Sequence, residues 1–274
     1  MMNKYLEANL DYVFRAKKRP KYTQDLNEVT LEETELYIHG DTKNIYRLSS
    51  FSKLNKLWLS YVNQKELNLI INLINPRMLC IYDIKASDLT SLEKLTNLEI
   101  LEIEWNTKAT ELWNISRNKL LKALYIKDFS RLHDISQITG GHNINILSLA
   151  GGNSKPLKLD TLKELAELRQ LEYLGLSNIK ILDESLDPLT ELKYLKELSI
   201  SNQFPTEEYA KLSMRLPHTK CEKFSAYSFL GSPIGGKDVM VVGKRKPLLS
   251  TREDTDKLQK YKERFKALQE KYKL

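Results

Sequence analysis

The chain has 274 residues, with 43 Lys and Arg against 36 Asp and Glu, and a calculated pI near 9.1. This length suits one large domain or two small ones with a substantial core. Because only 10 Gly and 8 Pro accompany 29% charged and 41% hydrophobic residues, the composition excludes collagen-like, low-complexity and disordered proteins. Residues 237–274 hold 12 basic and 6 acidic residues, so most of the net charge of +7 lies at the C-terminal end.

The N-terminal sequence predicts a helical cap over residues 1–30. Leu6, Leu10 and Val13 are spaced as i, i+4 and i+7, which favours an amphipathic helix. The charges among these residues leave no apolar run of the kind that a secretion signal needs, and no later run approaches the length of a membrane span. With only Cys80 and Cys221, far apart, the chain has no disulfide framework. We therefore expect a cytoplasmic protein.

A repeat fills the middle of the chain. Its unit is apolar-x-x-apolar-x-apolar, and copies recur every 21 to 27 residues. The middle apolar position falls at residues 36, 57, 79, 101, 124, 147, 174, 198 and 224. Alternation within each copy predicts a short strand with its leucines directed inward. The segments between copies, such as Leu67, Ile70, Ile71 and Ile74, change to helical spacing.

Residues 31–230 resemble the leucine-rich repeat family, in the short bacterial subclass typified by internalins. Segments 124–138 (LYIKDFSRLHDISQI) and 171–182 (LEYLGLSNIKIL) carry the resemblance. It implies an α/β fold: a curved solenoid with a parallel concave sheet of about nine strands and a helical or extended convex side. Because one repeat cannot bury both of its faces, both ends of such a solenoid need caps.

Residues 231–274 are predicted to form the C-terminal cap, with a strand at 238–242 and a basic amphipathic helix. Ser250 and Glu253 match a capping box that would start this helix. Its apolar seam consists of Leu258, Tyr261, Phe265, Leu268 and Tyr272. The seam fits either docking on the last repeat, which we favour, or a coiled coil between two copies.

The basic residues of this cap allow two interpretations. They are the solvated face of a capping helix, or they bind nucleic acid or an anionic membrane. The second hypothesis involves Lys244, Arg245, Lys246, Arg252, Lys260, Lys262, Arg264 and Lys266.

The sequence offers little for catalysis. Residues 231–237 (GSPIGGK) match most of a phosphate-binding loop, but Asp238 replaces the required Ser or Thr and a strand is predicted to follow. Cys80 lies at a strand position, yet the repeat supplies no base or oxyanion site for a nucleophilic thiol. The four histidines are scattered over different repeats. We therefore predict no enzyme, no cofactor and no metal site.

The concave face is the predicted binding surface. The outward positions of the first five strands are rich in aromatic and charged residues, whereas later strands carry Ser, Gly and Ala. The predicted partner-binding residues are Tyr37, Trp58, Tyr82, Glu102, Glu104, Tyr125, Lys127 and Asp128, with Trp105 as a further candidate. Aromatic residues surrounded by charge are typical of binding hot spots. The alternative is that these aromatics only pack against one another across the sheet.

These features predict a non-catalytic protein-protein recognition module, expected to be a monomer, that acts as an inhibitor, an immunity partner of a toxin or an adaptor. The alternative is an electrostatic binder of nucleic acid or anionic membrane through the C-terminal segment.

Overall fold

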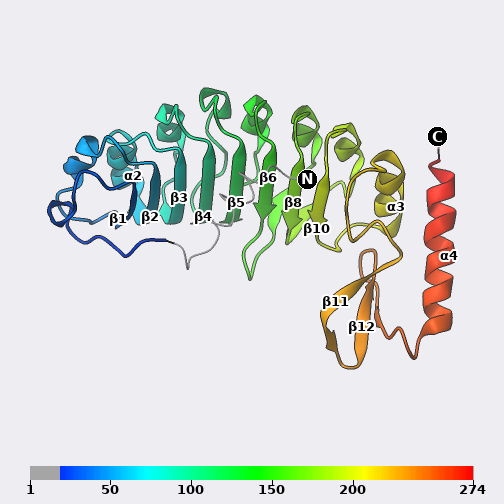
Figure 1. Cartoon of the computed structure of the whole chain (residues 1–274). Coiled ribbons are helices and arrows are strands. Elements are labelled where there is room, and N and C mark those ends of the chain that lie inside the picture. Colours follow the sequence, from blue (N-terminus) through cyan, green and yellow to red (C-terminus); the bar gives the residue numbers. More distant parts are fainter. Residues whose placement is uncertain (1–18, 274) are drawn as a thin grey trace.

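The computed structural model describes residues 19–273. A curved parallel sheet of eight strands runs along the molecule in the order β1-β2-β3-β4-β5-β6-β8-β10 (Figure 1). Its strands are β1 (Glu35–His39), β2 (Lys56–Asn63), β3 (Met78–Lys85), β4 (Ile100–Asn106), β5 (Ala123–Phe129), β6 (Ile146–Ala150), β8 (Tyr173–Ser177) and β10 (Glu197–Ile200). The predicted solenoid of parallel strands is thereby confirmed.

Short helices cover the convex side of the sheet. All repeats except those of β2 and β10 use a 3-10 turn after the strand, which fits because 3-10 helices occur in short pieces of this kind. The 3-10 turns are η2 (Leu26–Glu28), η3 (Ile45–Ser50), η4 (Thr90–Lys94), η5 (Ile115–Arg117), η6 (Ser136–Gly140), η7 (Lys163–Glu167) and η8 (Asp187–Glu191). The second repeat forms α2 (Gln64–Ile71), which begins with a capping box between Asn63 and Glu66.

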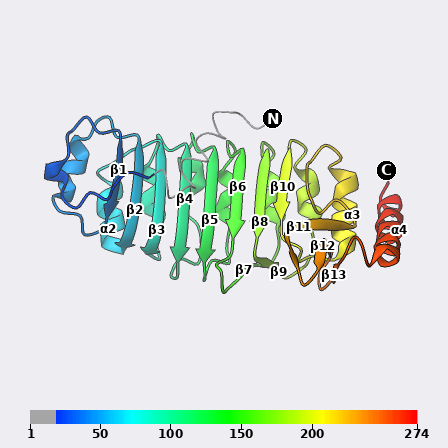
Figure 2. The same cartoon turned by 60° about the horizontal axis from the view of Figure 1, so that its bottom comes forward.

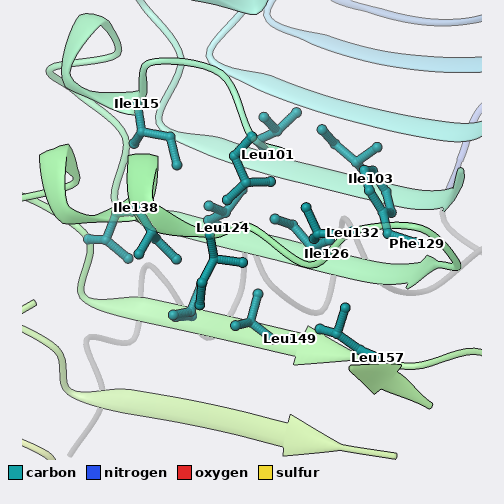
Figure 3. Packing of buried hydrophobic residues seen from close by; sticks show 14 of the residues in the cluster. Leu101, Ile103, Ile115, Leu124, Ile126, Phe129, Leu132, Ile138, Leu149 and Leu157 are labelled. Atoms are coloured by element: carbon teal, nitrogen blue, oxygen red, sulfur yellow. The ribbon is translucent and has the colours of Figure 1, made fainter. Parts of the chain in front are cut away.

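The core lies between the sheet and these turns. Leu101, Ile103, Leu124, Ile126 and Leu149 point inward from successive strands and meet Ile115 and Ile138 from the convex side (Figure 3). In each strand the two inward residues of the repeat are buried, as the alternation predicts. The same arrangement recurs from strand to strand, so every repeat buries its apolar side chains against its neighbours.

The ninth copy of the repeat is not a strand of the sheet. After β10, the chain forms α3 (Thr206–Arg215), and only a single parallel bridge joins Lys220 to Glu197. The chain then turns, because the Phe224 N–H donates to the Cys221 carbonyl. Cys221 lies at this turn and is half-buried. The expectation of about nine strands is therefore one too many.

The C-terminal part forms a small sheet and a helix. Strands β11 (Tyr227–Ile234), β12 (Lys237–Val241) and β13 (Leu248–Leu249) pair antiparallel, and helix α4 (Thr255–Lys271) runs beside α3 (Figure 1). A further pair of short strands, β7 (Leu157–Leu159) and β9 (Ile179–Ile181), extends two of the repeats (Figure 2). The predicted strand at 238–242 corresponds to β12.

Helix α4 docks on the end of the solenoid, in agreement with the favoured interpretation of its seam. Leu258 and Phe265 of the seam are buried, and Tyr261 and Leu268 pack against the same clusters. At the C-terminal end of the helix, Gln269 donates a hydrogen bond to Ser213 of α3 at 2.9 Å. The seam is thereby used within one chain.

The predicted start of this helix is wrong by several residues. Ser250 accepts hydrogen bonds from the N–H groups of Arg252 and Glu253, but these residues form a turn, and α4 begins only at Thr255. The carboxylate of Asp254 accepts the Ser250 N–H, and Asp238 of β12 accepts the Thr251 N–H. The first bond closes the turn within residues 250–254, and the second ties this turn to the small sheet, so α4 begins after it.

The predicted N-terminal helix around Leu6, Leu10 and Val13 lies outside the described residues. From residue 19 to residue 273, no helix is both long enough and apolar enough to cross a bilayer.

Candidate functional site

The concave face carries the predicted partner-binding residues, and the sheet register brings them together. Tyr37, Trp58, Cys80, Glu102 and Tyr125 are consecutive partners across β1 to β5. The next outward column contains Tyr82, Glu104 and Lys127 as neighbours on β3, β4 and β5. These residues therefore lie together on the concave face, as the alternation within each repeat predicts.

Their predicted exposure is wrong at two positions. Tyr37 is only 8% exposed and Trp58 only 5% exposed. For Tyr37 the reason is local: the Arg19 guanidinium lies 4.5 Å from its ring centroid, and Tyr22 contacts its edge. Glu102 and Tyr125 are half-buried, and burial raises the pKa of the Tyr125 hydroxyl. These four side chains therefore form a largely buried layer on the concave face, which we call its floor, and not an exposed surface.

An exposed row of rings lies near the carboxyl ends of the first four strands. We call Tyr22, His39, Tyr61, Tyr82 and Trp105 the aromatic ladder. Ring centroids are 3.9 Å apart between Tyr22 and His39, 4.9 Å between His39 and Tyr61, 6.3 Å between Tyr61 and Tyr82, and 5.7 Å between Tyr82 and Trp105. The first contact is stacked and the others are edge to face, the geometries that aromatic pairs prefer. Tyr22, Tyr61 and Trp105 remain 39%, 53% and 42% exposed.

Backbone geometry explains how Tyr61 and Trp105 join the ladder. Tyr61, Asp83, Trp105 and Asp128 occupy the same place in four consecutive strands, and all have a positive φ between 55° and 64°. This left-handed conformation is uncommon for residues other than glycine. The strand pairing passes over these residues: Ser60 pairs with Tyr82 and Val62 with Ile84, so Tyr61 and Asp83 are skipped. Each skipped residue therefore departs from the inward and outward alternation.

Charged groups continue the ladder on β4 and β5. Lys127 Nζ lies 2.6 Å from Glu104 Oε1, and the hydrogen bond to Glu104 raises the pKa of Lys127. Asp128 is half-buried next to this pair. A β-carbon at Gly152 would overlap the Asp128 carboxylate, so a larger residue there would have to displace this side chain. The ladder thus ends at an ordered group of charges.

Glu102, on the concave face beside the ladder, has an unusually high pKa. Burial and the neighbouring Glu104 raise the pKa of Glu102 to about 8, although a hydrogen bond from Cys80 lowers it in part. Burial, followed by Glu102, raises the pKa of the Cys80 thiol well above its usual value. A thiol with a raised pKa is a poor nucleophile. This pair does not resemble an activated catalytic cysteine.

Sequence reasoning missed two features of this surface. Tyr61 was not among the predicted residues, although it stands one position after the second outward column, as Trp105 does. A third column of residues on the concave face was also missed. It stands two residues before the column of Tyr37, Trp58 and Cys80 in each strand. It contains Met78, Ile100, Ala123 and Ile146, paired across β3 to β6, and it forms a separate buried apolar cluster. The steady repeat spacing could have revealed both.

A second candidate surface lies at the C-terminal cap. A hollow of about 390 Å³ at the start of α3 is lined by the basic residues Lys244, Arg245, Lys246 and Arg264 and by one acid, Glu207, which pairs with Lys271. Many other basic residues of the segment form ion pairs, such as Lys237 with Asp254 at 3.0 Å and Lys271 with Glu207 at 2.8 Å. Within residues 19–273, no acidic partner lies within ion-pair distance of Arg245, Lys246 or Arg264. The C-terminal charge is therefore divided among structural ion pairs, this hollow and exposed residues such as Lys260 and Lys266.

The stretch that matches a phosphate-binding loop is a hairpin turn. Gly235 and Gly236 have positive φ values of 56° and 77° and connect β11 to β12. No helix follows them directly, so backbone N–H groups are not directed at a phosphate as that motif requires. Across residues 19–273, no three His, Cys, Asp or Glu side chains gather in a way that could hold a metal ion.

Comparisons with known proteins give matches of structure only. No protein-family model matches the chain, and no curated protein matches its sequence. A leucine-rich repeat protein of Leptospira interrogans is similar in structure, with 20% identity and a TM-score of 0.57 over 73% of this chain and 52% of that chain. An internalin (inlF) of Listeria monocytogenes has 17% identity and a TM-score of 0.45 over 68% of this chain and 60% of its own. Internalin C2 of the same species has 20% identity and a TM-score of 0.41 over 56% and 66%.

The match to the Leptospira protein carries the fold assignment. This chain spans about half of that protein's length and less than two thirds of the first of the two internalins. At these identities the likeness concerns the fold alone. Together with the parallel sheet and its repeated core, it confirms the leucine-rich repeat architecture expected from the sequence.

Proposed function

We propose that this chain, a leucine-rich repeat protein by its fold, is a non-catalytic recognition module that binds a partner protein through the aromatic ladder and the adjacent Glu104–Lys127 pair. The solenoid presents an extended concave surface, and repeat proteins use such surfaces for binding. Binding would occlude or scaffold the partner, as an inhibitor, an immunity protein or an adaptor does.

One observation carries the proposal. Tyr61 and Trp105 keep about half of their surface exposed although they belong to a continuous row of ring contacts. Side chains that ring contacts already order lose little conformational entropy on binding, and this applies to Tyr61, which contacts a ring on each side, and to Trp105, which contacts Tyr82. Large aromatic side chains at an exposed patch are also the residue types that dominate binding energy. Lateral packing alone does not require this exposure.

The alternative is that the rings only stabilise the sheet. A double variant, Tyr61→Ala with Trp105→Ala, tests this in a quantitative affinity capture from extracts of the source cells. We expect it to lose a protein that the wild type retains, by roughly a hundredfold in affinity, since two hot-spot residues are removed. The matched control is Tyr46→Ala with Tyr194→Ala, which removes two exposed tyrosines away from the ladder.

Interpretation depends on both variants and on intact folding, checked by circular dichroism. Loss with the ladder variant and retention with the control support the proposal. Equal capture by the wild type and both variants would show that the ladder does not bind, and equal loss in both would show that the effect is not specific to it.

The basic hollow supports a second candidate function, binding of a nucleic acid. Arg245, Lys246 and Arg264 converge on the hollow without acidic partners, and clustered cations of this kind bind phosphate groups. The test is the salt dependence of binding to single-stranded RNA and to duplex DNA. Arg245→Ala with Arg264→Ala should reduce the slope of log affinity against log salt by roughly two contacts. Lys260→Ala with Lys266→Ala on the exposed surface of α4 is the charge-matched control, and equal slopes in both variants would remove this candidate.

We further propose a cytoplasmic, monomeric protein. Two observations support this: Cys80 and Cys221 are free thiols, and the apolar seam of α4 packs within its own chain. Sedimentation of the purified protein tests the oligomeric state.

A further inference from the structure

Aromatic and acidic residues alternate near the carboxyl ends of four neighbouring strands. Tyr61, Asp83, Trp105 and Asp128 occupy the same place in β2, β3, β4 and β5, each with a positive φ. Figure 2 shows these strand ends side by side at one edge of the sheet. Because neighbouring strands lie about 5 Å apart, Trp105 stands between two carboxyl groups, one on each adjacent strand.

Asp83 is a nearly buried acid without a partner in the described part of the chain. Its residue is only 9% exposed, and within residues 19–273 no hydrogen bond or ion pair reaches its oxygens. Neither oxygen is among the fully buried polar atoms that lack a partner, so the carboxylate still reaches solvent. A carboxylate that is largely removed from water bears a desolvation cost unless a cation compensates it. This position therefore favours a bound cation.

Asp128, on the other side of Trp105, is half-buried. Among residues 19–273 its carboxylate also has no hydrogen bond and no ion pair. Two lysines stand close to these acids in the chain. Lys127 donates instead to Glu104, and Lys85, two residues after Asp83, lies beyond ion-pair distance of it. The chain itself therefore leaves both carboxylates without a paired cation in its described part.

The side chains around the row titrate as acidic surroundings require. Burial raises the pKa of the Tyr82 hydroxyl, and Glu104 and Asp83 raise it further. The hydrogen bond to Glu104 raises the pKa of Lys127, and nearby acids, among them Asp128, add to this effect. Negative charges produce shifts of this sign, because they disfavour a further anion and favour a cation.

The indole between the two carboxylates selects the kind of cation. Trp105 is 42% exposed, and tryptophan is the side chain whose ring face attracts cations best. An arginine guanidinium is planar, stacks on aromatic rings and can donate two parallel hydrogen bonds to one carboxylate. A lysine ammonium is a compact charge without such a plane. The combination of indole and carboxylate therefore fits arginine better than lysine.

We propose that Asp83, Trp105 and Asp128 bind an arginine side chain of the partner protein, with its guanidinium on the indole and hydrogen-bonded to a flanking carboxylate. The inference rests on the proposed function, because it names the chemistry of the partner that the aromatic ladder receives. Since the contact joins opposite charges near the surface, salt should weaken it.

A peptide titration of the full chain tests this site. The probe is a peptide of sequence Gly-Gly-Arg-Gly-Arg-Gly-Gly with blocked ends, compared with peptides in which lysine or citrulline replaces arginine. Citrulline keeps the planar shape of arginine but has no charge. The readout is the indole N–H signal of Trp105 in a ¹⁵N NMR spectrum, assigned with Trp105→Phe. We expect a saturable shift with the arginine peptide, weaker binding of the lysine peptide, and binding of the citrulline peptide weaker by roughly tenfold or more.

The matched variants remove charge and preserve shape. Asp83→Asn with Asp128→Asn should weaken binding of the arginine peptide by roughly tenfold or more, and asparagine tolerates the left-handed backbone at both positions. Asp160→Asn with Asp256→Asn removes the same charge from two exposed positions outside the row and should leave the affinity unchanged. Circular dichroism checks that both variants are folded.

Four outcomes of the titration would overturn the proposal. They are no shift of the Trp105 signal with the arginine peptide, equal binding of the arginine and citrulline peptides, equal binding of the arginine and lysine peptides, and equal loss of affinity in the two double variants.

Affinity capture separates this inference from the proposed function. We expect Asp83→Asn with Asp128→Asn to lose the protein that the wild type retains. If this variant keeps the protein while Tyr61→Ala with Trp105→Ala loses it, the ladder binds its partner without the arginine site, and only the present proposal is overturned. Retention by both variants would overturn the binding function of the ladder as well.

Discussion

The thiol of Cys80 hydrogen-bonds to the carboxyl group of Glu102, its paired neighbour across β3 and β4. The two side chains lie on the concave face of the sheet, and both are half-buried. Cys80 packs against the apolar cluster of Met78, Ile100, Ala123 and Ile146. Burial favours the uncharged form of each. With a pKa of about 8, Glu102 carries a proton at neutral pH.

This raised pKa predicts how stability depends on pH. A carboxyl group whose pKa is higher in the folded than in the unfolded protein contributes stability that is complete below its unfolded pKa, near 4.5, and lost as pH rises through 8. Glu102→Gln mimics the protonated form. We expect it to be close to the wild type in stability at pH 4.5 and to exceed it by several kcal/mol at pH 8.5 in urea unfolding.

Glu99→Gln is a control of opposite sign on the same sheet. Hydrogen bonding to Arg77 lowers the pKa of Glu99, so its contribution is present above pH 4.5 and lost as pH falls through the lowered pKa. This variant should be less stable than the wild type at pH 7 and approach it in acid. The interpretation of Glu102 would be wrong if both variants showed the same pH dependence.

Met78, Ile100, Ala123 and Ile146 are buried on the concave face, so substitutions on both faces of β4 should lower the stability of the fold. Ile100 faces the concave side and Ile103 the core, yet both are almost fully buried. Ile100→Ala and Ile103→Ala should therefore cost similar free energies of unfolding, about 2 to 4 kcal/mol each. Denaturant titration measures both. A cost below about 0.5 kcal/mol for Ile100→Ala, typical of surface substitutions, would show that the cluster is solvent-exposed.

The sequence was sufficient to predict the architecture because the repeat determines it. The alternation within each copy defined which residues face the core, and those positions are buried in the structure. The prediction of a ninth strand failed because the spacing of apolar residues carries no information on neighbouring segments. Helix α3 and the turn at Cys221 remove this copy from the sheet.

Exposure on the concave face could not be predicted in the same way. Alternation tells which face a side chain occupies but not what else packs on that face, so Tyr37 was expected to be open although Arg19 and Tyr22 cover it. Tyr61 escaped notice because its left-handed backbone departs from strict alternation. Both cases depend on contacts or conformations that a two-residue period does not describe.

Gly152 is predicted to be required by the carboxylate of Asp128. Because a β-carbon at this glycine would overlap the Asp128 side chain, Gly152→Ala should displace that side chain and cost about 1 to 2 kcal/mol. A double-mutant cycle with Asp128→Ala separates this clash from other effects. In the Asp128→Ala background, Gly152→Ala should be nearly neutral. An equal cost in both backgrounds would place the conflict elsewhere.

A buried asparagine on the convex side is predicted to be among the most sensitive positions of the fold. Asn118 donates to the carbonyl groups of Leu92 and Leu95 at 2.9 and 3.0 Å and accepts the indole N–H of Trp113 at 2.7 Å. Asn118→Ala would leave the buried indole N–H of Trp113 without its partner and remove one of the two hydrogen bonds that each carbonyl accepts, so we expect a loss of about 2 kcal/mol in urea unfolding. Asn143→Ala removes a similar bond, from Asn143 to the Lys119 carbonyl at 2.8 Å, but at an exposed position. There water replaces the lost partner, and the cost should stay below about 1 kcal/mol. Similar losses in the two variants would contradict the argument, because burial is the property that distinguishes them.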